Sequence, residues 1–182
     1  MKNEIKYNVD WAKNQVIPEF VFFWGHKSHG KTITKACLSQ FYPCRFKKDG
    51  IVYNCAEQYM MSEKAKVFKD EEAHQLILSE SAPAQIKKYG RQIKNFNDEE
   101  WNKHKIKTVV EGNVLTFSQN EDLKEFLIET GDKMLVEASP HDRIWGIGID
   151  ANNPDANNPN KWKGENLLGF SLMEVRDIIK NK

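Results

Sequence analysis

The segment Phe20–Thr32 restricts the possible fold more than any other, because it matches the phosphate-binding loop pattern G-x-x-x-x-G-K-[ST]. Gly25, four residues and then Gly30-Lys31-Thr32 satisfy the pattern, and an apolar run precedes it like a strand. A true loop of this kind belongs to a mostly parallel sheet with crossover helices and a second strand that ends in an Mg²⁺-binding acid. The rest of the chain lacks that strand–helix–strand rhythm.

The pattern has few fixed letters and therefore matches by chance. We interpret residues 25–36 as a Gly- and Lys-rich surface loop. Two alternatives stay open: a nucleotide triphosphatase that uses Lys31, and a loop whose His26, His29 and Lys31 touch a ligand phosphate.

The composition indicates a single globular domain. The chain has 182 residues, 40% hydrophobic and 29% charged, and 27 Lys+Arg nearly cancel 26 Asp+Glu. Near-neutral charge gives no reason to expect tight non-specific binding to a nucleic-acid backbone. No apolar run approaches the ~20 residues of a membrane helix, and the N-terminus lacks a signal-peptide core. We expect a cytoplasmic protein without a membrane partner.

The cysteine and histidine spacings favour no metal site and no disulfide framework. Cys37, Cys44 and Cys55 form no C-x-x-C pair, and the five His show no H-x-H or H-x-x-x-H spacing. We expect reduced thiols that act as small buried hydrophobes, and the alternative of a catalytic cysteine stays open. No metal and no cofactor is expected.

Hydrophobic periodicity and turn residues predict a helix-rich α+β fold with a few short strands. Strands are expected at 19–24 and 51–53, with a hairpin turn at 48–50, and at 133–139 and 143–149. Residues 150–160 read as a polar loop. Asn120 and Gly131 are expected to bound the helix at 121–129. Helices are predicted at 54–68, 70–79, 83–89, 98–117, 121–129 and 166–179.

The predicted helix at 54–68 carries the strongest chemical signal. Most of its apolar side chains fall on one broad arc, and Glu57 and Lys64 lie in the middle of that arc, about 20° apart and roughly 10 Å apart along the axis. An acid and an amine on a buried face are costly unless they are paired or functional. A desolvated lysine can act as a nucleophile and a half-covered carboxyl as a general acid or base.

Both residues also have a purely structural interpretation. Asn54 and Glu57 have the spacing of a capping box. Lys64 can extend its ammonium to the surface while its methylenes stay buried.

The C-terminal third gathers Asp142, Trp145 and Gly146 around tight turns, followed by Asn166. A tryptophan offers a face for a nucleobase, and glycines let the backbone approach a flat ligand. In the alternative interpretation the tryptophans fill the core and Asn166 caps the last helix. Arg91, after the predicted helix end at Gly90, can hold a phosphate or serve a structural role.

Several strings then occur together and in order, from about Phe20 to Arg176. The strings are FFW, LSQFYPCRF, YNCAEQYMMSEKAKVF, KKYGR, FNDEEW, TGDKMLVEASPHDRIWGIGI and GENLLGFSLMEVR. In these strings the sequence resembles the NADAR family of YbiA-like N-glycosidases. The resemblance places residues 26–34 in a segment of variable length, where the Walker-like letters are accidental.

The resemblance implies a compact, helix-rich, single α+β domain over 1–182 and hydrolysis of an N-glycosidic bond. The implied substrates are ADP-ribose attached to guanine in DNA or RNA, or the phosphoribosylamino-pyrimidine intermediates of riboflavin synthesis. A module that binds ADP-ribose without cleaving it is the alternative.

The resemblance also assigns residues. Glu57 matches the active-site acid, and Lys64 matches the lysine proposed to attack the anomeric carbon. Asp142 and Trp145 match the pair that lines the pocket. Further substrate contacts are expected from Gly146, Arg45, Arg91 and Asn166.

Overall fold

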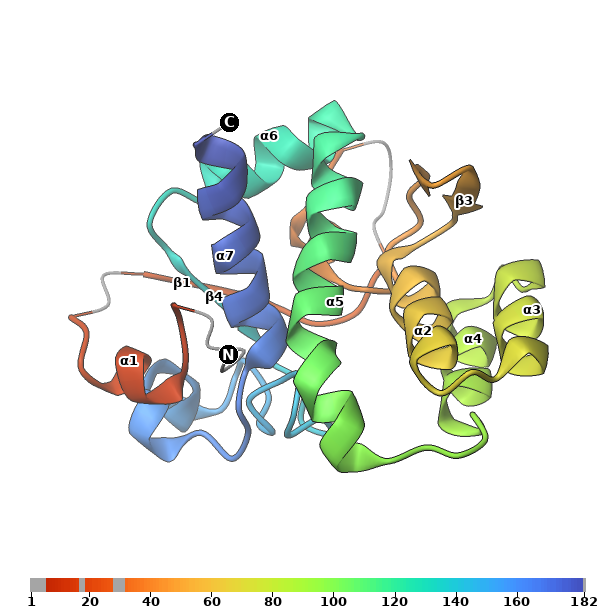
Figure 1. The fold of residues 1–182 in the computed structure, drawn as a ribbon. Helices are drawn as coiled ribbons and strands as arrows, with labels where there is room; N and C mark the ends of the chain where they lie inside the picture. The colour runs from red at the N-terminus through yellow and green to blue at the C-terminus, as the bar shows by residue number, and fades with distance from the viewer. Residues whose placement is uncertain (1–5, 17–18, 28–31, 182) are drawn as a thin grey trace. The chain divides into compact units, whose positions relative to one another are not determined.

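The computed structural model describes residues 6–16, 19–27 and 32–181 of the chain (Figure 1). Seven α-helices and four short strands lie within these residues, which confirms the expected helix-rich α+β fold. The chain divides into two compact units, one built on residues 40–121 and the other on residues 4–39 and 122–182, and each is described by itself. The single-domain organisation expected from the sequence stays a prediction.

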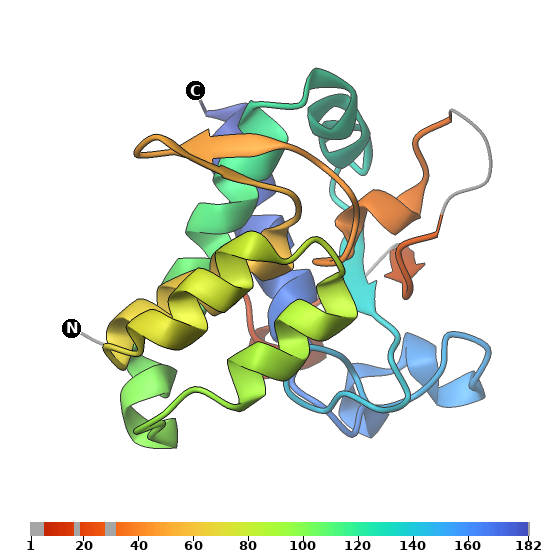
Figure 2. The same cartoon turned by 90° about the vertical axis from the view of Figure 1, so that its right-hand side faces the viewer.

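The first unit is built around the helix that carries Glu57 and Lys64. A hairpin of β2 (Phe46–Lys48) and β3 (Ile51–Tyr53) leads into α2 (Ala56–Val67). Its turn, Asp49-Gly50, has two positive φ angles of 49° and 86°, as a tight two-residue hairpin requires. Helices α3 (Glu71–Ser79), α4 (Pro83–Arg91) and α5 (Asp98–Ser118) all pack against α2, and Figure 2 shows α3 and α4 in front of it.

Local chemistry explains where these helices begin. The Asp70 side chain accepts a hydrogen bond from the Ala73 N–H at the start of α3, and Asn97 accepts one from Glu100 at the start of α5. Pro83 occupies the first turn of α4, where a missing N–H has no cost.

The predicted capping box of Asn54 and Glu57 is wrong. The N-cap of α2 is Cys55, without a side-chain cap, so the position three residues later is Gln58 rather than Glu57. Gln58 Oε1 accepts the Asn54 N–H at 2.8 Å, so Gln58 rather than Glu57 stands at the capping-box position.

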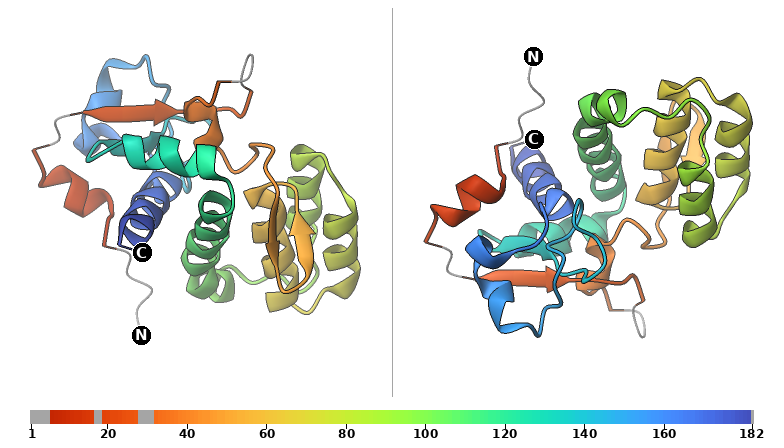
Figure 3. Two further views of the ribbon diagram at one scale, coloured as in Figure 1. Left: turned by 90° about the horizontal axis from the view of Figure 1, so that it is seen from above. Right: turned by 90° about the horizontal axis from the view of Figure 1, so that it is seen from below.

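The second unit contains a parallel strand pair, β1 (Phe20–Phe23) beside β4 (Met134–Glu137). Helix α7 (Leu167–Lys180), dark blue in Figure 3, packs against β4. Gly131, with φ of 59°, follows the end of α6 as expected. The remaining elements are α1 (Val9–Lys13), α6 (Glu121–Glu129) and the 3-10 helices η1 (Lys35–Leu38), η2 (Pro154–Asn157) and η3 (Pro159–Lys161).

The strand predicted at 143–149 is a loop. Its backbone pairs at isolated points rather than in a ladder: the Ile147 N–H donates to Glu137 O, and the Leu168 N–H donates to Trp145 O. Gly148 has φ of 69°, which an extended strand does not tolerate. Alternating apolar residues therefore mark burial here, not a strand.

The sheets do not support the nucleotide-triphosphatase alternative. Within the described residues the strands form two separate pairs, β1–β4 and β2–β3, and not the multi-stranded parallel sheet of phosphate-loop enzymes. Residues 28–31, which include His29, Gly30 and Lys31 of the matching pattern, lie outside the described residues. No helix in the described part of the chain is long and apolar enough to span a bilayer.

Candidate active site

Helix α2 places Glu57 and Lys64 in the interior of the first unit. Glu57 is only 5% exposed and Lys64 only 9%, because α3, α4 and α5 pack around the helix. The Glu57 N–H donates to the Gln40 carbonyl at 2.9 Å, which ties the first turn of α2 to the segment before β2. Both candidate catalytic residues are therefore withdrawn from bulk solvent, as their place on the predicted buried arc required.

Lys64 does not extend its ammonium to the surface, so that structural interpretation is wrong. Its Nζ donates a hydrogen bond of 2.8 Å to the Gly90 carbonyl at the end of α4. The same nitrogen lies 4.1 Å from the ring centroid of Phe96 and 5.9 Å from that of Trp101. The amine is thus held between one backbone oxygen and two aromatic rings.

Burial lowers the pKa of Lys64 from its ordinary value, since an ammonium loses hydration inside the protein. The charges of Asp98 and Glu57 oppose this effect, and the positive charge of Arg91 adds to it. A larger fraction of neutral amine at neutral pH is the chemical consequence. A neutral amine is the form that can attack an electrophilic carbon.

Of the two candidate arginines in this unit, Arg91 lies where its positive charge acts on Lys64. Arg91 is exposed at the end of α4, directly after Gly90. Arg45 is exposed before β2, where its backbone carbonyl accepts a hydrogen bond from Asn120. The donor in that bond is Asn120 Nδ2, whereas the expected cap of α6 would use Oδ1 and stays a prediction.

The second unit carries the remaining candidates, beginning with a turn after β4. The Asp142 Oδ1 accepts the N–H groups of Ile144 at 2.9 Å and of Trp145 at 2.8 Å. This carboxylate shapes the loop that presents the half-buried Trp145. A Cβ on Gly146 would lie 2.8 Å from the Glu137 carbonyl oxygen, so only glycine fits where the loop meets the end of β4.

Asn166 has a role that sequence reasoning missed. It precedes α7 with φ of 52°, and its side chain does not cap that helix. Instead its Nδ2 donates to the Leu135 carbonyl at 3.0 Å, and its Oδ1 accepts the Glu137 N–H at 2.9 Å. The fully buried amide thus pairs with the backbone of β4 and holds the strand that leads into the Asp142–Gly146 loop.

Two further groups were also missed. The Gln58 Nε2 donates to three carbonyls at the end of α3, those of Ile77, Leu78 and Glu80. Phe96 and Trp101 cover the lysine amine, although they come from more than thirty residues further along the chain. The FNDEEW string was a visible signal for both rings, but nothing in its spacing pointed to Lys64.

Cys44 and Cys55 do not compete for a catalytic role. All three are free thiols. Burial raises the pKa of the Cys44 thiol to about 11 and that of Cys55 to about 12. A nucleophilic cysteine needs the opposite shift, so their chemistry favours small buried hydrophobes.

Comparisons with known proteins agree with one another. The family model described as "NADAR domain" matches residues 22–180. "N-glycosidase R617" from Acanthamoeba polyphaga mimivirus is 44% identical over 164 residues, which cover 87% of this chain and 95% of that protein. "Riboflavin biosynthesis protein VVA0006" from Vibrio vulnificus is 29% identical over 172 residues, 93% of this chain but 41% of that protein.

The fold also has a solved counterpart. "N-glycosidase YbiA" from Escherichia coli is 28% identical over 142 residues, which cover 78% of this chain and 80% of that protein. The NMR structure of E. coli YbiA superposes with a TM-score of 0.70 and 22% identity, covering 93% of this chain and 89% of YbiA. The fold expected from the resemblance is therefore confirmed.

Proposed function

The chain belongs to the NADAR domain family, and we propose that it is an N-glycosidase. It hydrolyses the bond between C1 of a ribose that carries phosphate or an ADP group and the nitrogen of a nucleobase-like amine. The observation that carries this proposal is the buried Lys64 amine, desolvated and hydrogen-bonded to Gly90, on the same helix as the buried Glu57. The name of the R617 relative supports the same reaction class.

The proposed reaction uses both side chains. Neutral Lys64 attacks C1 while the C1–N bond breaks, and the bond's electron pair leaves on the base nitrogen. The Glu57 carboxyl supplies the proton that this nitrogen takes up. The lysine nitrogen of the sugar–lysine adduct gives its extra proton to the Glu57 carboxylate, which restores the carboxyl. The adduct then opens to a Schiff base, and water hydrolyses it to the free sugar and the amine. No metal and no cofactor takes part in these steps.

Two substrate classes are proposed. One is ADP-ribose on guanine in DNA or RNA. The other is a phosphoribosylamino-pyrimidine of riboflavin synthesis, which the name of the VVA0006 relative supports. Near-neutral charge argues against a long nucleic-acid footprint, but an enzyme that takes one extruded or unpaired base needs few phosphate contacts. A cytoplasmic location is part of the proposal.

The remaining residues are proposed to bind substrate. Trp145 offers its face to a base, and Asp142 orients a ribose hydroxyl through the carboxylate oxygen that the turn leaves free. Gly146 lets the backbone approach the ligand. Arg91 and Arg45 contribute positive charge for phosphate. Asn166 acts through the strand that its amide holds.

The test offers both substrate classes to the wild-type protein side by side and measures free ADP-ribose or ribose phosphate by chromatography. Glu57→Gln and Lys64→Ala should each abolish release. The matched controls are Glu63→Gln and Lys66→Ala, an ion pair at 2.7 Å on the more exposed side of the same helix, which should keep activity. A wild-type protein that releases no base from either substrate, together with ADP-ribose binding that survives Glu57→Gln, would instead identify a binding module.

A further inference from the structure

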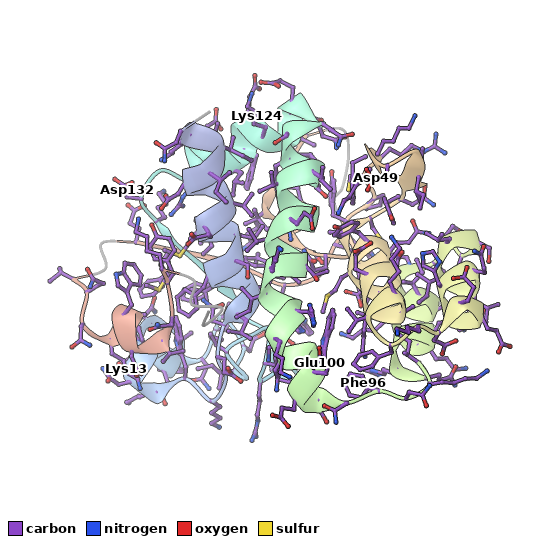
Figure 4. All side chains as sticks on the ribbon, viewed as in Figure 1. Lys13, Asp49, Phe96, Glu100, Lys124 and Asp132 are labelled. Atoms are coloured by element: carbon purple, nitrogen blue, oxygen red, sulfur yellow. The ribbon has the colours of Figure 1, made fainter. Side chains whose placement is uncertain are left out.

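The connector between α4 and α5, residues 92–97, follows a fixed path past the end of α2. Its Ile93 is buried, and its Asn95 adopts a left-handed φ of 57°, which few residues other than glycine and asparagine tolerate. The next residue is Phe96. Figure 4 labels Phe96 on this connector, below α2.

The Phe96 ring lies over the lysine amine, although 40% of the residue remains exposed. It packs edge-on against Phe68, which follows α2, with ring centroids 5.2 Å apart. The Phe96 ring also contacts Lys64, whose Nζ lies 4.1 Å from the ring centroid. The ring covers the amine whose chemistry the proposed reaction uses.

Asp70 holds the connector in this place. Its Oδ1 accepts the Ala73 N–H at 3.1 Å as the cap of α3, and its Oδ2 accepts the Lys94 N–H at 2.7 Å in the connector. The residue is 7% exposed, so both bonds form largely out of water. A second tie, between Lys94 Nζ and Glu72 Oε2, joins two well-exposed side chains and should contribute little.

We propose that Phe96 is a positioning residue for Lys64: its ring, held by the connector that Asp70 anchors, caps the amine, excludes water from it and keeps it against the Gly90 carbonyl. The catalytic consequence rests on the proposed function. The capping itself is a property of the folded chain and can be measured without substrate.

Two opposing effects of the ring decide the expected sign. Its π face attracts the ammonium, which favours the charged form by less than about tenfold at a partly exposed site. Its apolar bulk removes water, which disfavours the charged form and can do so by several powers of ten when burial is complete. The exclusion of water therefore dominates, in agreement with desolvation being the largest influence on the pKa of Lys64. The charges that face this amine are Glu57 on α2, Arg91 on α4 and Asp98 on α5, and the substitutions below change none of them.

Competitive acetylation tests the capping directly. The protein is treated with acetic anhydride across a pH series, and the extent of reaction at Lys64 is read by peptide mass spectrometry. Phe96→Ala should raise the limiting rate at Lys64 by about tenfold or more and move the midpoint to higher pH. Phe96→Leu keeps apolar cover but lacks the π face, so its midpoint should stay at or below that of wild type. Leu76→Ala, which removes a side chain of similar exposure (43%) from α3, should change neither value.

A second variant tests the anchor. Asp70→Ser can still cap α3 through its shorter hydroxyl, but it cannot reach the Lys94 N–H as well, so it should move the Lys64 midpoint in the same direction as Phe96→Ala. The proposal is overturned if Phe96→Ala changes the limiting rate at Lys64 by less than twofold and leaves its pH midpoint within the scatter seen for Leu76→Ala. If the acetylation midpoint of Lys64 shifts as expected but the wild-type protein cleaves neither substrate, the capping is upheld and the proposed function is rejected.

Discussion

The side chain of Lys64 on α2 is joined to the last turn of α4 by a 2.8 Å hydrogen bond from Nζ to the Gly90 carbonyl. Gly90 also sits against Met61 of α2, so closely that a Cβ at position 90 would overlap the Met61 thioether. The same glycine therefore sets both the spacing of the two helices and the place of the lysine amine.

Gly90→Ala should destabilise the protein by about 1–3 kcal/mol, because the added methyl must displace Met61 or separate the helices. Activity should fall together with stability, since the carbonyl that accepts from Lys64 moves. Met61→Ala in the same chain makes room for the methyl, so the double variant should lose less than the sum of the two single variants. Urea unfolding of the four proteins in this cycle measures the coupling. Strict additivity would show that the contact is unimportant.

The pH dependence of activity should follow the lowered pKa of Lys64. Attack on C1 needs the neutral amine, so the limb of the kcat profile that reports Lys64 should rise with pH through a midpoint below the ordinary lysine value of 10.5. The measurement is a profile of kcat against pH on whichever substrate is cleaved, together with borohydride trapping of the adduct. An adduct that still forms in Lys64→Ala would remove lysine from the mechanism.

Stability should change with pH through the same residue. The pKa of Lys64 is lower in the folded than in the unfolded chain, so the unfolded chain binds more protons at intermediate pH. Its contribution to stability is therefore complete above the unfolded value of 10.5 and is lost as pH falls through the folded pKa. Lys64→Met should raise Tm relative to wild type at pH 7 and should raise it less at pH 10. An equal difference at both pH values would contradict the assigned pKa direction.

Gln58→Ala should lower the free energy of unfolding by about 1–3 kcal/mol, because it leaves the buried carbonyls at the end of α3 without their shared donor. Gln58→Glu preserves the shape but turns a carboxylate toward those carbonyls, so it should be at least as harmful at pH 7. Gln75→Ala is the matched control, since that exposed glutamine makes one contact with Glu71 within α3. Chemical unfolding distinguishes them, and similar losses in Gln58→Ala and Gln75→Ala would argue against the role of Gln58.

Asn166→Gly and Asn166→Ala should both destabilise the second unit, by about 2–4 kcal/mol, because each removes two buried hydrogen bonds to β4. Alanine should cost about 1 kcal/mol more than glycine, since position 166 has a left-handed φ. Hydrogen exchange at the Glu137 amide should accelerate in both variants. Unchanged protection there would show that the amide of Asn166 does not hold the strand.

Much of the local structure could be predicted from the sequence. The six longer helices lie within a few residues of their predicted bounds. Apolar periodicity and the start and stop signals Asn97, Pro83 and Gly131 depend only on residues close by in the chain. The hairpin at Asp49-Gly50 follows from the same kind of local rule. Periodicity also placed Glu57 and Lys64 on the inner face of α2 before any neighbour of that helix was known.

Where prediction was wrong, a distant group had taken the place of the local one. Residues 143–149 have the apolar alternation of a strand, but the end of β4 and residues 163–168 supply their backbone partners, so no ladder forms. Asn166 has the identity and position of a helix cap, yet β4 occupies its amide. Where a side chain can bond either a nearby or a remote backbone group, the tertiary fold decides which of the two becomes its partner.

The sequence alone thus determined the six longer helices, the buried arc and the presence of an acid and an amine on the same face of one helix, since each depends on spacing along the chain. Only the tertiary structure decided what surrounds that amine. The Gly90 carbonyl and the Phe96 and Trp101 rings reach Lys64 from other elements, and burial of the amine among such neighbours lowers the pKa of the lysine. Desolvation arises from all neighbours in space, so no pattern within one helix can report it.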